Sequence, residues 1–171
     1  MTHIPIRDLQ LGLHDRSSNV FVDTTDYVRS LNLPPRLDGF YLKTEFHVCL
    51  IEFAENRASQ ELCEKITAAS NPAAHFISDN PPRLNGQFRR AVHPIDDRES
   101  IIGLVDMPGF DKWCDAIRAA LGGDTNFAVP HITLYTKQPD KGIGLYNQHE
   151  YDERTQLLEP EIVEKLRSYL T

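Results

Sequence analysis

The sequence predicts an α+β fold, because segments typical of strands and of helices are both present and do not alternate regularly. Aromatic and β-branched residues concentrate in segments 40–53 and 127–136, as in strands. Segments 59–70, 110–121 and 160–170 carry apolar residues at helical spacing. A regular strand–helix alternation would indicate a parallel sheet, and its absence favours α+β.

The first predicted strand, 40–53, precedes a polar turn at residues 55–57. The helix predicted over 59–70 ends at Asn71-Pro72, since proline cannot continue a helix. We expect strand followed by helix in this part of the chain.

The middle of the chain, 76–105, predicts shorter strands, of which 101–105 is buried. A helix follows over 110–121 and stops at Gly122-Gly123. After the strand at 127–136, the last helix opens at Pro160, a residue favoured in the first helical turn.

The chain has 171 residues, of which 40% are hydrophobic, enough to bury a core without disulfides or a structural metal. We therefore expect a single domain over residues 1–171. Cys49, Cys63 and Cys114 are scattered, which fits neither a disulfide framework nor a paired zinc motif. The sequence thus predicts a reducing compartment and no metal or other cofactor.

The formal net charge of -7 would repel a long polyanion, so duplex DNA is not an expected partner. A short nucleotide or an RNA end fits better. The first residues lack a secretory pattern, and no apolar run is long enough to span a bilayer. We expect no membrane partner and a cytoplasmic protein, whereas the sequence does not indicate an oligomeric state.

Two predicted strands present similar sets of polar side chains, because residues two apart in a strand share a face. In the first strand one face would carry Tyr41, Lys43, Glu45, His47 and Cys49. In the second strand one face would carry His131, Thr133, Tyr135 and Lys137. Each face offers a histidine, a tyrosine and a lysine, which suits binding and cleavage of a phosphate ester.

These motifs, His47-Val48-Cys49-Leu50 and Pro130-His131-Ile132-Thr133-Leu134, resemble the paired His-x-Ser/Thr motifs of the two-histidine phosphoesterases. The second motif matches fully, whereas Cys49 stands where the family has a hydroxyl. The resemblance implies a bilobal fold with pseudo-twofold symmetry and antiparallel sheets around a central cleft. It also implies metal-independent hydrolysis of a cyclic phosphate or phosphodiester in a nucleotide, a cyclic oligonucleotide or an RNA end.

The chemistry is consistent with this resemblance, since histidine has the ordinary pKa closest to neutrality and two histidines can serve as base and acid. His47 and His131 are the candidate catalytic residues, with the two roles not assigned. Thr133, and more weakly Cys49, would hold the non-bridging oxygens. The remaining candidates are Lys43 and Lys137 for phosphate, and Tyr41 and Tyr135 for stacking on a base.

Two other functions remain open. A protein with the same fold could bind nucleotides without cleaving them, with Cys49 marking the lost activity. A hydrolase or transferase could instead use Cys49 as nucleophile with His47 as its base. The Gly142-Ile143-Gly144 segment lacks the context of a dinucleotide-binding fingerprint, so we predict a flexible loop near the second motif.

Overall fold

Strands and helices occur in mixed order, which confirms the α+β prediction. The structure, a computed structural model, describes residues 10–14, 17–52, 75–122 and 125–170, together with residues 61, 64, 65, 68, 69 and 73. In chain order the elements are β1 (Gln10–His14), β2 (Ser17–Asp23), α1 (Thr25–Ser30), β3 (Arg36–Leu37), β4 (Phe40–Leu42), β5 (His47–Glu52), α3 (His75–Ser78), β6 (Arg83–Val92), β7 (Glu99–Asp106), α4 (Phe110–Leu121), β8 (His131–Thr136), α5 (Gln148–Arg154), β9 (Thr155–Leu157) and α6 (Pro160–Arg167).

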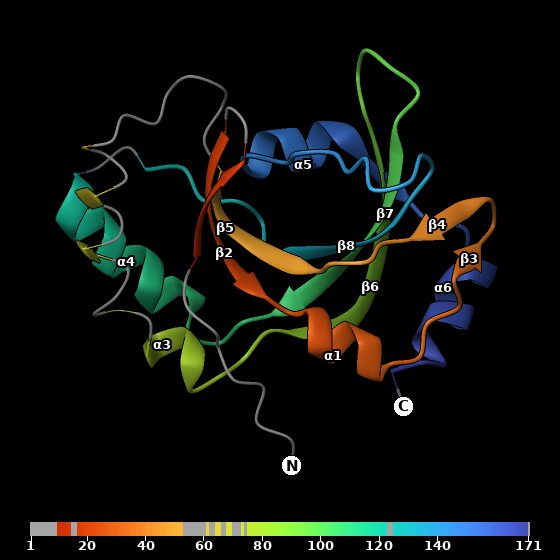
Figure 1. The fold of residues 1–171 in the computed structure, drawn as a ribbon, viewed down its shortest axis with the longest axis horizontal. Coiled ribbons are helices and arrows are strands. Elements are labelled where there is room, and N and C mark those ends of the chain that lie inside the picture. Colours follow the sequence, from red (N-terminus) through yellow and green to blue (C-terminus); the bar gives the residue numbers. More distant parts are fainter. Residues whose placement is uncertain are drawn as a thin grey trace.

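The nine strands of the described residues form one sheet rather than separate sheets (Figure 1). Its order is β1-β2-β5-β8-β7-β6-β9, and the β3–β4 hairpin joins β8 through β4. All of these pairings are antiparallel. The strands that begin with His47 and His131, β5 and β8, are therefore neighbours at the centre of the sheet.

The element order contains a repeat that is not visible in the sequence. In the first half a hairpin (β1–β2) and a helix (α1) precede a central strand (β5), with the β3–β4 hairpin inserted between α1 and β5. In the second half the hairpin β6–β7, the helix α4 and the central strand β8 follow in the same order. Each half thus contributes one central strand and one histidine motif.

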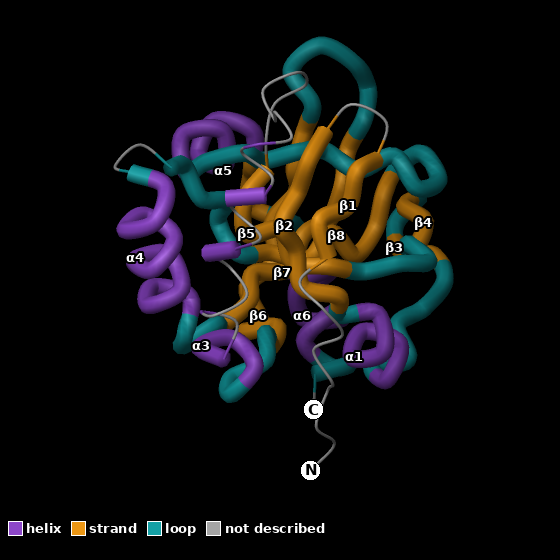
Figure 2. The backbone as a smooth tube through the Cα atoms, turned by 60° about the vertical axis from the view of Figure 1, so that its left-hand side comes forward, coloured by secondary structure: helices purple, strands orange, loops and turns teal. Residues whose placement is uncertain are grey.

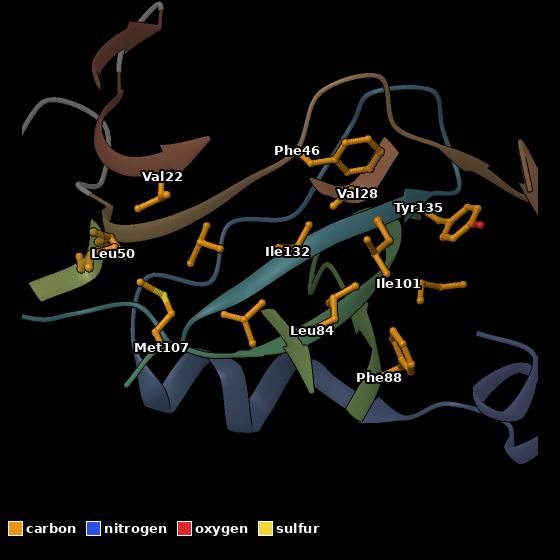
Figure 3. Packing of buried hydrophobic residues seen from close by; sticks show 14 of the residues in the cluster. Val22, Val28, Phe46, Leu50, Leu84, Phe88, Ile101, Met107, Ile132 and Tyr135 are labelled. Atoms are coloured by element: carbon orange, nitrogen blue, oxygen red, sulfur yellow. The ribbon is translucent and has the colours of Figure 1, made fainter. Parts of the chain in front are cut away.

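The two faces of the sheet are covered differently. The larger core lies on one face, where Val28 of α1, Ile77 of α3, Trp113 of α4 and Leu166 of α6 are buried. Figure 3 shows part of this core, including Ile132 and Tyr135 of β8. A smaller cluster lies on the other face, where Tyr151 of α5 packs against it. Accordingly, Figures 1 and 2 show α5 across the sheet from α1 and α3. The smaller cluster consists of Ala91, Ile102, Ile143 and Leu145.

The predicted strand 40–53 is interrupted, because residues 43–46 separate β4 from β5, each of which pairs with β8. The start of α1 holds this break: Thr24 N donates to the Phe46 carbonyl at 2.9 Å, and Phe46 N donates to Thr25 Oγ1 at 3.0 Å. The strand predicted over 127–136 begins only at His131. The helix predicted over 59–70 lies largely outside the described residues.

Gly103 of β7 packs beneath side chains of β6, which gives a testable prediction about the core. An added Cβ would overlap Leu84 Cδ2 and lie 3.2 Å from Phe88 Cε1. We expect Gly103→Ala to lower the free energy of unfolding by about 1–3 kcal/mol through overpacking. Urea denaturation measures this loss. Gly142→Ala is the control, since the nearest atom to its Cβ is Thr133 Cγ2 at 4.0 Å; equal losses in both variants would contradict the prediction.

Candidate functional site

The pairing of β5 with β8 brings the two predicted motifs together. Val48 lies opposite Ile132, and both side chains are fully buried in the larger core. Continuing this antiparallel register by one residue on each side sets His47 opposite Thr133 and Cys49 opposite His131. Because side chains alternate between faces, these four residues share the face opposite the larger core. We call His47, Cys49, His131 and Thr133 the motif quartet.

The spacing within the motif quartet suits a phosphate group. Residues directly opposite one another in an antiparallel pair have Cβ atoms about 5 Å apart, and diagonal neighbours lie about 7 Å apart. His47 and His131 are diagonal neighbours in this register. Their rings can therefore flank a phosphorus atom, with Thr133 within reach of one of its oxygens.

Each motif is followed by a β-bulge at the same position. In β5, Ile51 pairs with Val20 and Cys49 with Phe21, so Leu50 is the extra residue. In β8, Tyr135 pairs with Ile101 and Thr133 with Ile102, so Leu134 is the extra residue. Leu50 stands three residues after His47, and Leu134 stands three residues after His131. The two motif strands thus share a local geometry as well as a sequence pattern.

The bulge in β8 overturns part of the predicted face, because an extra residue reverses the alternation beyond it. Tyr135 lies in the larger core, fully buried, and its hydroxyl donates to the Pro34 carbonyl at 3.0 Å. Burial raises the pKa of this hydroxyl above its ordinary value. Tyr135 therefore does not accompany His131 and Thr133, and it cannot stack on a base there.

Lys137 is also directed away from the motif quartet. Its ammonium donates to the Glu99 carboxylate, which the Arg90 guanidinium contacts at 2.7 Å. Hydrogen bonds from Lys137 and Arg90 hold the pKa of Glu99 below its ordinary value. Arg90 also contacts Glu159, next to α6. Lys137 thus belongs to an ion-pair network that joins strand ends to the last helix.

His131 is held in a defined tautomer. Its Nδ1 lies 2.7 Å from the Val129 carbonyl oxygen, and because that oxygen can only accept, Nδ1 carries the hydrogen. Nε2 then keeps its lone pair. Only 6% of the residue is exposed, and burial lowers its pKa despite the opposing hydrogen bond to Val129. The arrangement is that of a neutral imidazole able to accept a proton.

His47 has a more open environment than His131. It is only partly buried, and the centroid of its ring lies 5.1 Å from that of Phe21, its neighbour on β2. The preceding residue, Phe46, is fixed by Thr24 and Thr25, so the start of α1 determines where β5 begins. The two histidines therefore differ in burial, although their motifs are alike.

Residues 141–146, which we call the strap, border the motif quartet on the side of β7. A Cβ added at Gly142 would lie 4.0 Å from the Thr133 methyl carbon, and Ile143 and Leu145 are buried in the smaller core with Ile102. Helix α5 fixes the strap: Arg154 donates to the Gly144 carbonyl at 3.2 Å. The strap is near the second motif, as predicted, but it is held in place rather than flexible.

The opposite side of the site is formed by the β3–β4 hairpin. Tyr41 pairs with Thr136, which lies beyond the bulge, so the Tyr41 side chain lies on the face of the motif quartet. Lys43, two residues after Tyr41, is partly buried. Sequence reasoning missed Arg36, whose guanidinium carbon lies 4.5 Å from the centre of the Tyr41 ring. The signal for this hairpin is Asp38-Gly39, since both residues have positive φ, 49° and 82°, as a two-residue hairpin turn requires.

Within the described residues, no group of three or more His, Cys, Asp or Glu side chains could hold a metal ion. None of the helices described here combines the length and apolar character needed to cross a bilayer. Comparisons with protein-family models, curated proteins and solved structures return no match. The function is therefore inferred from the geometry of the site.

The burial of His131 predicts its titration. We expect its ring signals in a pH-dependent NMR experiment to move only below the range typical of histidine, because burial disfavours the charged ring. Since the unfolded chain takes up this proton near pH 6.5, the free energy of unfolding should fall as the pH drops through that value. A His131 signal that titrates like a histidine in an unfolded peptide would contradict the prediction.

Proposed function

We propose that the protein hydrolyses a cyclic phosphate or phosphodiester in a nucleotide, a cyclic oligonucleotide or an RNA end, with His47 and His131 as a metal-independent acid–base pair. The observation that carries this proposal is the register of β5 and β8, which aligns both motifs on one face. Histidines at diagonal positions, with Thr133 between them and the strap, suit a phosphate ester. The paired bulges and the repeated hairpin–helix–strand order further support a two-histidine phosphoesterase fold with pseudo-twofold symmetry.

The different environments of the two histidines suggest their roles. Nε2 of the neutral His131 accepts a proton from water, whose oxygen attacks phosphorus. The bond from phosphorus to the ribose oxygen breaks, and protonated His47 donates its proton to that oxygen. The product is a phosphate monoester. His47 then takes back a proton as His131 releases one, which restores the starting state.

Thr133 and Cys49 occupy equivalent places in the motif quartet. The Thr133 hydroxyl donates to a non-bridging oxygen as negative charge grows there. Cys49, 9% exposed, offers only a thiol, a weaker donor than a hydroxyl. Transition-state charge is therefore stabilised less strongly on the β5 side than on the β8 side.

The first test is hydrolysis of a panel of 2',3'-cyclic-phosphate RNA ends, cyclic nucleotides and cyclic oligonucleotides in EDTA. We expect product from the wild type, and a loss of kcat of at least about 100-fold in His47→Ala and in His131→Ala, because each variant lacks a proton-transfer group. Circular dichroism checks that both variants fold. His149→Ala is the control, since that side chain is 78% exposed on α5. Folded variants with unchanged turnover would refute the acid–base pair.

The same panel addresses a binding function without catalysis, which predicts saturable nucleotide binding with no product from any substrate. This alternative is favoured by Cys49, because the weaker donor in the motif quartet reduces charge stabilisation. Product formation by the wild type that disappears in both histidine variants excludes it.

Cys49→Ser separates the phosphoesterase from a thiol-dependent hydrolase. In this alternative His47, which shares a face with Cys49, is the base for the thiol, and the register also sets His131 opposite Cys49. If the hydroxyl of serine acts as a donor, we expect kcat/KM to rise several-fold, because a hydroxyl is the better donor. Loss of activity in Cys49→Ser, together with inactivation of the wild type by a small alkylating reagent, would instead identify Cys49 as a nucleophile.

A further inference from the structure

Arg36 and Tyr41 form a stacked pair on the face of the motif quartet. Cross-strand pairing runs from Arg36 to Tyr41, from Tyr41 to Thr136, and from Thr136 to Ser100, so these four residues form one row across the sheet. Ser100 stands two residues before Ile102, which pairs with Thr133. The row of Arg36 is therefore adjacent to the row of Thr133 on the same face.

Packing fixes the position of this pair. Leu37 and Phe40, which lie opposite one another in the hairpin, are 4% and 4% exposed and belong to the larger core. Their burial turns Arg36 and Tyr41 to the other face, because neighbouring residues in a strand point in opposite directions. The guanidinium carbon of Arg36 lies over the Tyr41 ring, 4.5 Å from its centre, so the ring contacts the guanidinium from one side. A planar guanidinium held in this way keeps its N–H edge available to a phosphate.

The charge of Arg36 is not neutralised locally. Arg90 and Arg154 form ion pairs with Glu99 and Glu150. Arg36 is exposed and forms no ion pair with an acidic side chain of the described residues. In a protein of formal net charge -7, an exposed cation beside the motif quartet is a preferred place for an anion.

The distance from the motif quartet matches an adjacent phosphate of the same nucleotide. Arg36 is two strands and one row from Thr133, so their Cα atoms lie roughly 12 Å apart. The Arg36 side chain spans part of that distance, and the side chain of His47, which lies opposite Thr133, spans another part. A 2',3'-cyclic phosphate ends an RNA chain, so the nearest other phosphate is on the 5' oxygen of the same nucleoside.

We propose that Arg36, held by Tyr41, binds the 5'-phosphate of the nucleoside whose 2',3'-phosphate lies between His47 and His131. This inference rests on the proposed function and specifies its substrate class. The protein then prefers an RNA end, or a nucleotide with a 5'-phosphate, over a nucleoside cyclic phosphate that has none.

Equilibrium binding tests the inference without requiring turnover. The two probes are adenosine 3'-phosphate and adenosine 3',5'-bisphosphate, measured by isothermal titration calorimetry at one salt concentration. We expect the wild type to bind the bisphosphate about ten-fold more tightly, as one charge-assisted phosphate contact supplies. Arg36→Ala should remove this difference and leave the Kd of the monophosphate unchanged. Arg36→Lys should recover only part of it, because lysine lacks the planar, bidentate group.

Arg118→Ala is the matched control, since Arg118 is also an exposed arginine stacked on an aromatic ring, 4.8 Å from the centre of Phe127, but lies on α4. It should retain the ten-fold difference. The inference is overturned if Arg36→Ala keeps the difference, if it weakens both probes equally, or if the wild type does not distinguish or bind the probes. The proposed function is decided separately by hydrolysis of the cyclic-phosphate panel. An Arg36-dependent preference without any hydrolysis would retain the binding site and reject the catalytic proposal.

Discussion

The antiparallel pairing of β5 with β8 is the constraint on which the candidate site depends. Val48 and Ile132 lie opposite one another and are fully buried, and each contributes about 1.5–3 kcal/mol of stabilisation through burial. A slip of one residue would move both side chains out of the larger core and turn the motif quartet into it. The free energy that stabilises the core therefore also fixes the alignment of His47 with Thr133 and of Cys49 with His131.

The two halves of the fold contribute equivalent strands but create different environments. Hairpin, helix and central strand follow in the same order in both halves, and each motif is followed by a bulge. The strap, held by α5, borders the site on the β7 side, whereas the β3–β4 hairpin borders it on the opposite side. His131 is buried, whereas His47 is partly exposed. This asymmetry fits the proposed acid–base pair, whose members must start in opposite protonation states.

Several cations of the described residues are engaged in ion pairs, whereas Arg36 is not. Glu99 pairs with Lys137 and with Arg90, which also contacts Glu159 next to α6, whereas Glu150 and Arg154 pair within α5. Arg36 instead stacks on Tyr41, in the β3–β4 hairpin that borders the motif quartet. The proposed binding of a short phosphate-bearing ligand is thus compatible with an overall charge that disfavours long nucleic acids.

The sequence by itself determined the α+β class, the helix at 110–121, the start of the last helix at Pro160 and the position of both motif histidines in strands, because each depends on local periodicity or residue type. It could not locate the bulge at Leu134, which arises from pairing with β7 and moves Tyr135 and Lys137 to the other face. Nor did local pattern reveal the partners of Lys137, or the stacking of Arg36 on Tyr41. Which strand lies beside which, and in what register, is decided by packing between residues far apart in the chain. Only the tertiary structure therefore shows which of the predicted side chains share one site.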